Sequence, residues 1–547
     1  MSPHNLKPRL GAEFAEHRYP AHAKIVATLG PASDSPEMLE KLMVAGVNVF
    51  RLNFSHGSLE QQGVRFDRVR DVAAATGRVV AILGDLQGPK MRVGTVPDID
   101  DGGGIMVQTG QDVLFHRDQG EAEKLAAGDG ITAVFGTTFD AMFEDVEPGQ
   151  RVLVNDGSIR MLAVDRKRGE SIRARVTHGG RVTSNKGVNL PETELSIPAV
   201  TSRDWKCVEW GVERGVDLFA LSFVRTASEV EELKDRLLDM GALVPHHMDE
   251  AIEGRVSLQI PVIPKIEKPQ ALDNLDDIIR VSDGIMVARG DLGVEMEVYE
   301  VPVWQKHIVE RCAAFGRPCI VATQMLESMI TEPMPTRAEA SDVANAIFDG
   351  ADAVMLSGET AVGHHPDLVV ETMSRIVRAA EDRIDQIVER THPPMPDLPE
   401  FPFRSAALAA GAWHVADRAG AKLAVVWSQT GGMARYLSQH DFRVPIIAFT
   451  SSDVVARRMT IMGGVHPIRV EPPEDGLLAT WTDQVEEMAK ARGWVEDGDR
   501  VVMIAGKPLG STAGQDIMAI LRVGDPISGF RSSDALVETA SEGGGGI

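Results

Sequence analysis

Eight short apolar segments, alternating with helical patterns, constrain the fold of this chain more than any other feature. Each segment is rich in Val, Ile, Leu and Ala, as expected for strands buried on both faces of a parallel sheet. Amphipathic stretches lie between them, for example at 35–45, 228–238 and 341–349. Eight strand–helix units predict an α/β fold of the (β/α)8 TIM barrel type. The segments are 24–29, 47–53, 79–86, 216–223, 261–267, 284–291, 318–325 and 353–359.

One long interval between the third and fourth segments breaks this rhythm. Residues 92–191 are rich in Gly and contain short alternating stretches at 112–116, 151–156 and 172–176. Alternation with period two, bounded by turn residues, predicts small antiparallel strands. We therefore expect a small β-barrel-like lid domain inserted into a barrel loop, on the face where barrel loops carry function.

A proline-rich stretch at 392–402 predicts a stiff linker after the barrel. Beyond it a helical pattern near 405–419 and apolar runs at 423–427, 445–449 and 500–505 predict a smaller C-terminal α/β domain. The predicted division is an N-terminal extension at 1–20, a catalytic barrel at 21–92 and 191–385, a lid at 93–190, a C-terminal regulatory-type domain at 386–530 and a flexible tail at 531–547.

Charge and cysteine content exclude several classes of function. The 547 residues carry a formal net charge of -24, which disfavours binding to nucleic acid or to anionic membranes. Cys207, Cys312 and Cys319 fit no zinc spacing and are expected to be free thiols in a reducing compartment. No segment is apolar for long enough to span a bilayer, and residues 1–20 lack the apolar centre of a secretory signal. These features predict a cytoplasmic protein.

Polar residues stand where every one of the eight segments ends. In a barrel of this type the chemistry takes place at the C-terminal ends of the strands. A single charge at such a position is usually solvated or ion-paired, but polar groups at all eight ends predict a ring of active-site residues. In chain order they are Thr28; Arg51, Asn53 and Ser55; Asp85; Ser222; Lys265 and Glu267; Arg289 and Asp291; Thr323; Ser357 and Glu359.

Two carboxylates of this ring suit a divalent cation. Glu267 and Asp291 end neighbouring segments, and such oxygen ligands favour Mg²⁺ or Mn²⁺ with water and substrate completing the shell. Lys265 stands two residues before Glu267 and faces the same way along the strand. Together with Arg51 it would clamp phosphoryl oxygens. A structural salt bridge between Lys265 and a neighbouring carboxylate is the alternative. The glycine-containing turn at 289–293 suggests a pocket for a substrate carboxylate.

Seven sequence blocks together resemble pyruvate kinase, over residues 24–523. The resemblance implies phosphoryl transfer between phosphoenolpyruvate and ADP in glycolysis by a Mg²⁺-dependent (or Mn²⁺-dependent), cytoplasmic homotetramer. The blocks are KIVATLGPAS (24–33), FRLNFSHG (50–57), NKGVNLP (185–191), PKIEK (264–268), IMVARGDLGVE (285–295), ATQMLESMI (322–330) and PTRAEASDVANAIFDGADAVMLSGETA (335–361).

The resemblance also implies a role for each matching residue. On the phosphoenolpyruvate side, Arg51 would hold the phosphate, Lys265 would stabilise the transferring group and the enolate, Glu267 and Asp291 would bind the metal, the backbone N–H groups of Gly290 and Asp291 would receive the carboxylate, and Thr323 would help to deliver the proton. On the nucleotide side the matching residues are Asn53, His56, Arg92, Lys186, Thr28 and Pro31, with Asp156 as a weaker match. The lid would close over the barrel and exclude water.

The chain departs from the common family pattern at residue 90. Many relatives read TKGPE after the third strand, whereas this chain reads LQGPK at 86–90. In relatives with the Glu, a potassium ion lies among groups matching Asn53, Ser55, Asp85 and the carbonyl of Leu86. Lys90 places a fixed ammonium in that region, and a permanent cation can substitute for a bound one. The sequence therefore predicts that potassium is dispensable.

Further interpretations have to be weighed on sequence alone. The loop SQTGGM at 428–433 fits a phosphate cradle for an effector or a plain surface turn. A metal-dependent aldolase or a C–C lyase could use a similar barrel ring, but it would have no use for Arg92, Lys186 and a lid. A non-catalytic relative would be expected to lose Lys265 or its metal ligands, and all of them are present. The histidine pairs at 246–247 and 364–365 are interpreted as surface residues.

Overall fold

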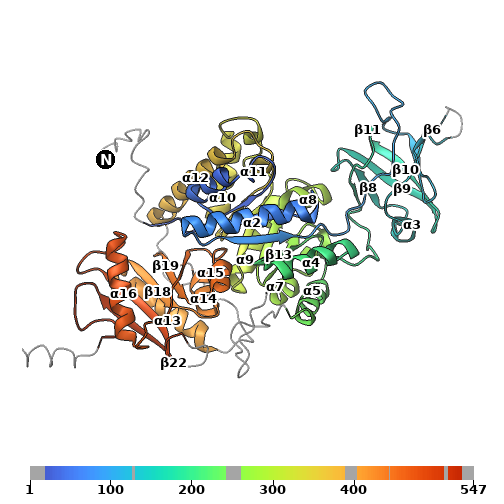
Figure 1. Ribbon diagram of the computed structural model, residues 1–547. Coiled ribbons are helices and arrows are strands. Elements are labelled where there is room, and N and C mark those ends of the chain that lie inside the picture. The colour runs from blue at the N-terminus through green and yellow to red at the C-terminus, as the bar shows by residue number, and fades with distance from the viewer. Residues whose placement is uncertain are drawn as a thin grey trace, which may run out of the picture. The chain divides into compact units, whose positions relative to one another are not determined.

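The computed structural model describes residues 19–125, 130–241, 260–387, 403–440, 442, 444–510 and 515–531 (Figure 1). The chain forms two compact units, one of residues 25–246 and 257–376 and the other of residues 1–24, 247–256 and 377–547. The predictions for residues 1–18, for His246 and His247, for the proline-rich linker and for the tail beyond Arg531 fall outside the described residues.

The first unit contains the predicted barrel. Eight parallel strands close in the order β1-β17-β16-β15-β14-β13-β3-β2, and each predicted segment contains one of them, so the TIM barrel is confirmed. Most of their residues are buried, since the strands pack against side chains on both faces. The strands are β1 (Lys24–Thr28), β2 (Val47–Asn53), β3 (Ala81–Asp85), β13 (Leu218–Leu221), β14 (Val262–Ile266), β15 (Ile285–Ala288), β16 (Cys319–Ala322) and β17 (Ala353–Leu356).

Helices follow the barrel strands, and local capping fixes where several of them begin. The Ser35 side chain accepts a hydrogen bond from Met38 N, and Ser58 and Gln61 form a capping box, which satisfies N–H groups left free at helix starts. The helices of this unit are α1 (Pro36–Ala45), α2 (Leu59–Thr76), α4 (Ser202–Arg214), α5 (Ala227–Asp239), α6 (Pro269–Asp273), α7 (Leu275–Val281), α8 (Arg289–Glu295), α9 (Val301–Ala314), the 3-10 helix η2 (Glu327–Ile330), α10 (Arg337–Phe348), α11 (Gly358–Ala361) and α12 (Pro366–Ile387), which runs on into the second unit.

The β-rich insertion is also confirmed. Its strands form a seven-stranded sheet, in the order β12-β8-β9-β10-β5-β7-β6, and a two-stranded sheet of β11 and β4 around a shared apolar core. The contacts group this insertion with the barrel, so the predicted domain boundaries remain a prediction. Its elements are β4 (Ile105–Val107), β5 (Asp112–His116), β6 (Glu123–Lys124), β7 (Ala133–Phe135), α3 (Met142–Asp145), β8 (Arg151–Val154), β9 (Ile159–Lys167), β10 (Ser171–His178), β11 (Gly180–Val182) and β12 (Val188–Asn189).

The second unit is the predicted α/β domain. Its five-stranded sheet has the order β20-β19-β18-β21-β22, with only β22 antiparallel to its neighbour. Trp427, Phe449 and Trp481 pack together in its core. The elements are α13 (Phe403–Ala419), β18 (Leu423–Trp427), α14 (Gly432–Gln439), β19 (Ile446–Thr450), α15 (Asp453–Met459), β20 (Val465–Arg469), α16 (Leu478–Ala491), β21 (Arg500–Lys507) and β22 (Gln515–Arg522). Across the described part of the chain, no helix combines the length and the apolar character needed to span a membrane.

Candidate active site

A buried carboxylate, Asp85 at the end of β3, gathers two cationic side chains, Arg51 of the adjacent β2 and Lys265 of β14, two strands away. Nε of Arg51 donates to Oδ2 of Asp85 at 2.6 Å, and Nζ of Lys265 lies 3.4 Å from Oδ1. Arg51 also donates through Nη1 to Oγ1 of Thr28 at 3.0 Å. Burial by itself raises the pKa of Asp85, but Arg51 and Lys265 hold this pKa below its ordinary value. Asp85 is therefore an ionised anchor that orients both cations, a role that the sequence did not reveal.

Lys265 forms a second ion pair with Glu267. Nζ of Lys265 lies 2.9 Å from Oε1 of Glu267, while Oε2 of Glu267 accepts a hydrogen bond from Phe223 N at 2.8 Å. Burial and the nearby charge of Asp291 raise the pKa of Glu267 to about 7, against the lowering effect of Lys265. Burial lowers the pKa of Lys265, but Asp85 and Glu267 raise it by more, so Lys265 is charged. The ion pair that the sequence left open as an alternative is therefore present in the structure.

Glu267 and Asp291 have the chemistry of a divalent metal site. Oε1 of the fully buried Glu267 is paired with the ammonium of Lys265 but lacks a well-formed hydrogen bond. Asp291, in the first turn of α8, is close enough to affect the pKa of Glu267. Among the described residues no group of three or more His, Cys, Asp or Glu side chains could hold a metal. Two carboxylates that leave most positions to water and substrate fit Mg²⁺ better than a closed protein cage.

Thr323 occupies a strained turn directly after β16. Thr323 and Gln324 have φ angles of 69° and 55°, which are unfavourable for residues other than Gly and especially for a β-branched one. Oγ1 of Thr323 accepts from Gly290 N at 2.7 Å and donates to Ala322 O at 2.6 Å. The turn is held from outside by Arg289, whose Nη2 donates to Thr323 O at 2.7 Å. The structure thus joins Thr323 to the start of α8.

Arg289 is itself fixed by two partners. Its Nη1 donates to Oδ1 of Asp342 at 2.7 Å and to Oε1 of Gln305 at 3.2 Å. A guanidinium with several fixed donors holds one orientation better than an ammonium does. The sequence placed Arg289 at a strand end but gave no sign of its contact with the Thr323 turn.

Several basic groups surround His56 at the mouth of the barrel. Burial lowers the pKa of His56, and Lys90, Arg51 and Arg92 lower it further through their charges. Each of these three cations is therefore close enough to His56 to contribute to a positive field there. Because an anionic ligand would relieve their mutual repulsion, this group suits phosphate oxygens.

The remaining residues predicted for a nucleotide site are spread more widely. Nη1 of Arg92 donates to Asn185 O at 2.8 Å, next to the exposed Lys186 in the inserted domain. Asn53 is half-buried and accepts from Ser55 N, and Pro31 is exposed. Within the described ranges, no hydrogen bond or ion pair joins Lys186 to the group around Lys265.

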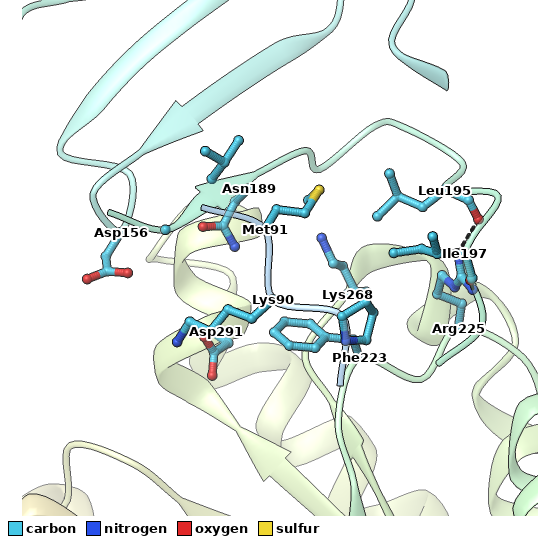
Figure 2. A pocket seen from close by; sticks show the side chains of 13 residues that line it. Lys90, Met91, Asp156, Asn189, Leu195, Ile197, Phe223, Arg225, Lys268 and Asp291 are labelled. Atoms are coloured by element: carbon cyan, nitrogen blue, oxygen red, sulfur yellow. Dashed lines mark hydrogen bonds between the residues drawn. The ribbon is translucent and has the colours of Figure 1, made fainter. Parts of the chain in front are cut away.

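Residues of the barrel and of the inserted domain line one pocket of about 540 Å³, part of which is open to solvent. Figure 2 shows Lys90, Phe223, Lys268 and Asp291 among its lining side chains, together with Asp156 of the inserted domain. Asp291 thus links this pocket to the group around Glu267.

Asp204 fixes the segment that leads to Lys90. It closes a capping box with Thr201 at the start of α4, and its Oδ1 accepts from Gln87 N at 2.9 Å and Gly88 N at 3.3 Å. Sequence reasoning missed this residue, although a Thr–x–x–Asp spacing before a helix signals the capping box.

Three comparisons with known proteins all identify the same family. The family models "Pyruvate kinase, barrel domain" and "Pyruvate kinase, alpha/beta domain" match residues 21–370 and 406–521. A pyruvate kinase of Mycobacterium intracellulare is 40% identical over 504 residues, covering 92% of this chain and 98% of the relative. One of Sporosarcina psychrophila is 39% identical over 507 residues, covering 92% of this chain and 80% of the relative. The crystal structure of a pyruvate kinase from Cryptosporidium parvum superimposes with a TM-score of 0.79 at 30% identity, over 92% of this chain and 96% of that one. The chain belongs to the pyruvate kinase family of phosphotransferases.

Proposed function

We propose that this enzyme transfers the phosphoryl group of phosphoenolpyruvate to ADP, forming pyruvate and ATP, as a step of glycolysis. The observation that carries the proposal is the buried group of Arg51, Asp85, Lys265 and Glu267 at the barrel mouth. It provides two oriented cations and a carboxylate with an unsatisfied oxygen, which is what a transferring phosphoryl group and its metal require.

Arg51 and Lys265 would bind and orient the phosphoryl group. Asp85 fixes Nε of Arg51 and Thr28 accepts from Nη1, so Nη2 of the guanidinium stays available to phosphate oxygens. Lys265 is charged and positioned by Asp85 and Glu267. Because these donors are aligned before substrate arrives, they would stabilise the charge that develops during transfer without reorganising.

Glu267 and Asp291 would hold the divalent cation, Mg²⁺ or Mn²⁺. The ion would supply positive charge that neutralises phosphoryl oxygens of the substrates. The role of this chain is to offer the unsatisfied Oε1 of Glu267 and the carboxylate of Asp291 at one side of the phosphoryl site.

The start of α8 and Thr323 would handle the rest of phosphoenolpyruvate. Gly290 N and Asp291 N would receive its carboxylate, so the bond from Gly290 N to Oγ1 of Thr323 would give way to the substrate. Thr323 would then be free to help pass a proton, through water, to the methylene carbon of the enolate. The strained turn supports this role, since strain of this kind gathers at functional sites.

The nucleotide would bind where the basic group around His56 meets the inserted domain. Asn53, His56, Arg92 and Lys186 would contact its phosphates, and Thr28, Pro31 and Asp156 would line its site. The inserted domain would act as a lid that excludes water from the reacting phosphoryl group.

Lys90 would make the enzyme independent of potassium. Its influence on the pKa of His56 supports a position within the positive field of the site. A covalently held ammonium in that field would take over the charge of a bound monovalent ion.

The enzyme would work as a cytoplasmic homotetramer. Val298, Tyr299 and Val303 have exposed fractions of 72%, 71% and 68%, within and just before the start of α9. Large apolar side chains gathered on a surface favour association with another protein surface.

A coupled assay tests the proposed reaction. Purified protein is mixed with phosphoenolpyruvate and Mg²⁺, with and without ADP, and pyruvate is followed through a dehydrogenase. The proposal expects pyruvate only when ADP is present, with and without potassium. Pyruvate formed equally well without ADP would favour a phosphatase-like or lyase-like reaction instead.

A further inference from the structure

Glu295, at the end of α8, links the inserted domain to the barrel. Its side chain is buried, with 1% of the residue exposed. Oε1 accepts from Nδ2 of Asn189 in β12 at 2.8 Å and from Nζ of Lys268, just after β14, at 2.6 Å. Oε2 is buried without a hydrogen bond. One carboxylate oxygen thus joins a side chain of the inserted domain to one of the barrel; Figure 2 shows both Asn189 and Lys268 at the pocket.

A second contact reaches the same end of α8. A Cβ atom added at Gly157, in the turn after β8, would lie 3.4 Å from Cγ1 of Val294. The backbone of the inserted domain therefore comes close to the last turn of the helix. The same short helix begins with Arg289, Gly290 and Asp291. The inserted domain therefore contacts one end of α8, and the proposed substrate site lies at the other end.

Lys268 keeps the carboxylate of Glu295 paired if the hydrogen bond to Asn189 is broken. Its ammonium is the charge partner of Glu295 and is held in the barrel, 6.0 Å from the centre of the Phe223 ring. If Asn189 leaves, Glu295 loses a neutral donor but keeps its cation, so the buried carboxylate is not left unpaired. Oε2 of Glu295 remains a second buried acceptor without a hydrogen bond.

We propose that Glu295 is a positioning residue: it ties the inserted domain, through Asn189, to the helix that carries Gly290 and Asp291. This latch of Asn189, Glu295 and Lys268 makes the setting of α8 depend on whether the inserted domain is in contact with the barrel. The inference rests on the proposed function for its effect on turnover, but the latch itself exists or fails independently of it.

The first test removes the donor of the inserted domain with Asn189→Ala and uses Gln108→Ala, an exposed amide of the same domain, as the matched control. Loss of a hydrogen bond to a charged group predicts a fall in kcat/KM of about tenfold for Asn189→Ala and none for the control. Hydrogen exchange with phosphoenolpyruvate and Mg²⁺ present reports on the latch directly. Amides of 289–295 should exchange faster in Asn189→Ala, with an unchanged melting temperature.

The second test is a double-mutant cycle with Glu295→Gln. If the two residues act through one bond, Asn189→Ala should have little further effect in the Glu295→Gln background. Asn189→Asp, which places a second carboxylate against Glu295, should be worse than Asn189→Ala. If Glu295→Gln does not fold because Lys268 loses its charge partner, the Asn189 variants alone decide whether the latch exists.

The outcomes separate the two claims. Unchanged exchange in 289–295 and unchanged kcat/KM in both Asn189 variants would overturn the latch. A wild-type protein that makes no pyruvate would overturn the proposed function, while faster exchange of α8 in Asn189→Ala would still support the latch.

Discussion

Nζ of Lys265, on β14, lies 2.9 Å from Oε1 of Glu267, the residue that follows this strand. The pair stands at the centre of the proposed site, because Lys265 also approaches Asp85 and Glu267 also accepts from the backbone of Phe223. The strand therefore delivers a cation and the carboxylate of the proposed metal site on one face, two residues apart.

Replacing Lys265 should abolish most of the activity without unfolding the protein. Lys265→Met removes a preorganised donor, for which we expect kcat to fall by about 10²–10³-fold. Arg51 still neutralises Asp85, and Glu267 can take up a proton because its pKa is already raised to about 7. Steady-state kinetics and circular dichroism would measure the two effects. Lys206→Met, on the exposed face of α4, is the control and should leave kcat unchanged.

Replacing Lys90 by Glu should make the enzyme depend on potassium. Lys90→Glu exchanges a fixed cation for a carboxylate, so a bound monovalent cation would be needed to restore the positive charge. Activity of the variant should rise steeply with KCl when choline chloride keeps the ionic strength constant, whereas wild type should respond little. A wild-type enzyme that is inactive without potassium would contradict this explanation of Lys90.

Replacing Glu267 by Gln should weaken metal binding. Mn²⁺ binding measured by electron paramagnetic resonance should lose at least about tenfold in affinity, since an anionic ligand becomes a neutral one. Glu213→Gln, at an exposed position of α4, provides the matched control. Equal Mn²⁺ affinity in wild type and Glu267→Gln would place the metal elsewhere.

His466 should make the second unit less stable in mild acid. Burial lowers the pKa of His466 well below its ordinary value, and Lys24, His22 and Arg378 lower it further. In the unfolded chain His466 takes up a proton near pH 6.5, whereas in the folded protein it stays neutral at this pH. The free energy of unfolding is therefore highest above pH 6.5 and decreases as the pH falls below it. The loss is at most about 1.4 kcal/mol per pH unit for one group.

Denaturation with urea at pH 7 and pH 5 would measure this effect. His466→Gln cannot take up the proton, so its free energy of unfolding should fall less between these pH values than that of wild type. His414→Gln, at an exposed position of α13, should behave as wild type does. Identical pH dependence in wild type and His466→Gln would show that other groups govern the acid sensitivity.

The barrel could be predicted because each of its strands leaves a local signal. A strand buried on both faces must be apolar throughout, and its polar end marks the functional face. In the second unit, some strands leave no such local signal. β20 has the sequence VHPIR and is mostly half-buried, so it contains no apolar run from which a strand could be predicted. β22 was not predicted from the sequence either. Strands of this kind are recognised only once their neighbours are known.

The types of residue in the candidate site could be predicted from the sequence, but the residues that hold them in place could not. Asp85, Asp204 and Glu295 each act through partners that lie far away along the chain, such as Arg51 at 34, Gln87 at 117 and Asn189 at 106 positions. Such pairs form only when the barrel closes, and no local pattern encodes them. The same holds for Arg289, whose contact with the Thr323 turn depends on the adjacency of β15 and β16.

The stoichiometry of the reaction, followed by phosphorus magnetic resonance, tests the proposed phosphoryl transfer most directly. Protein, phosphoenolpyruvate, ADP and Mg²⁺ are mixed in buffer without potassium, and the signals of phosphoenolpyruvate, ATP and inorganic phosphate are recorded together. We expect one ATP to appear for each phosphoenolpyruvate consumed, with little inorganic phosphate. Consumption of phosphoenolpyruvate with inorganic phosphate in place of ATP would contradict it.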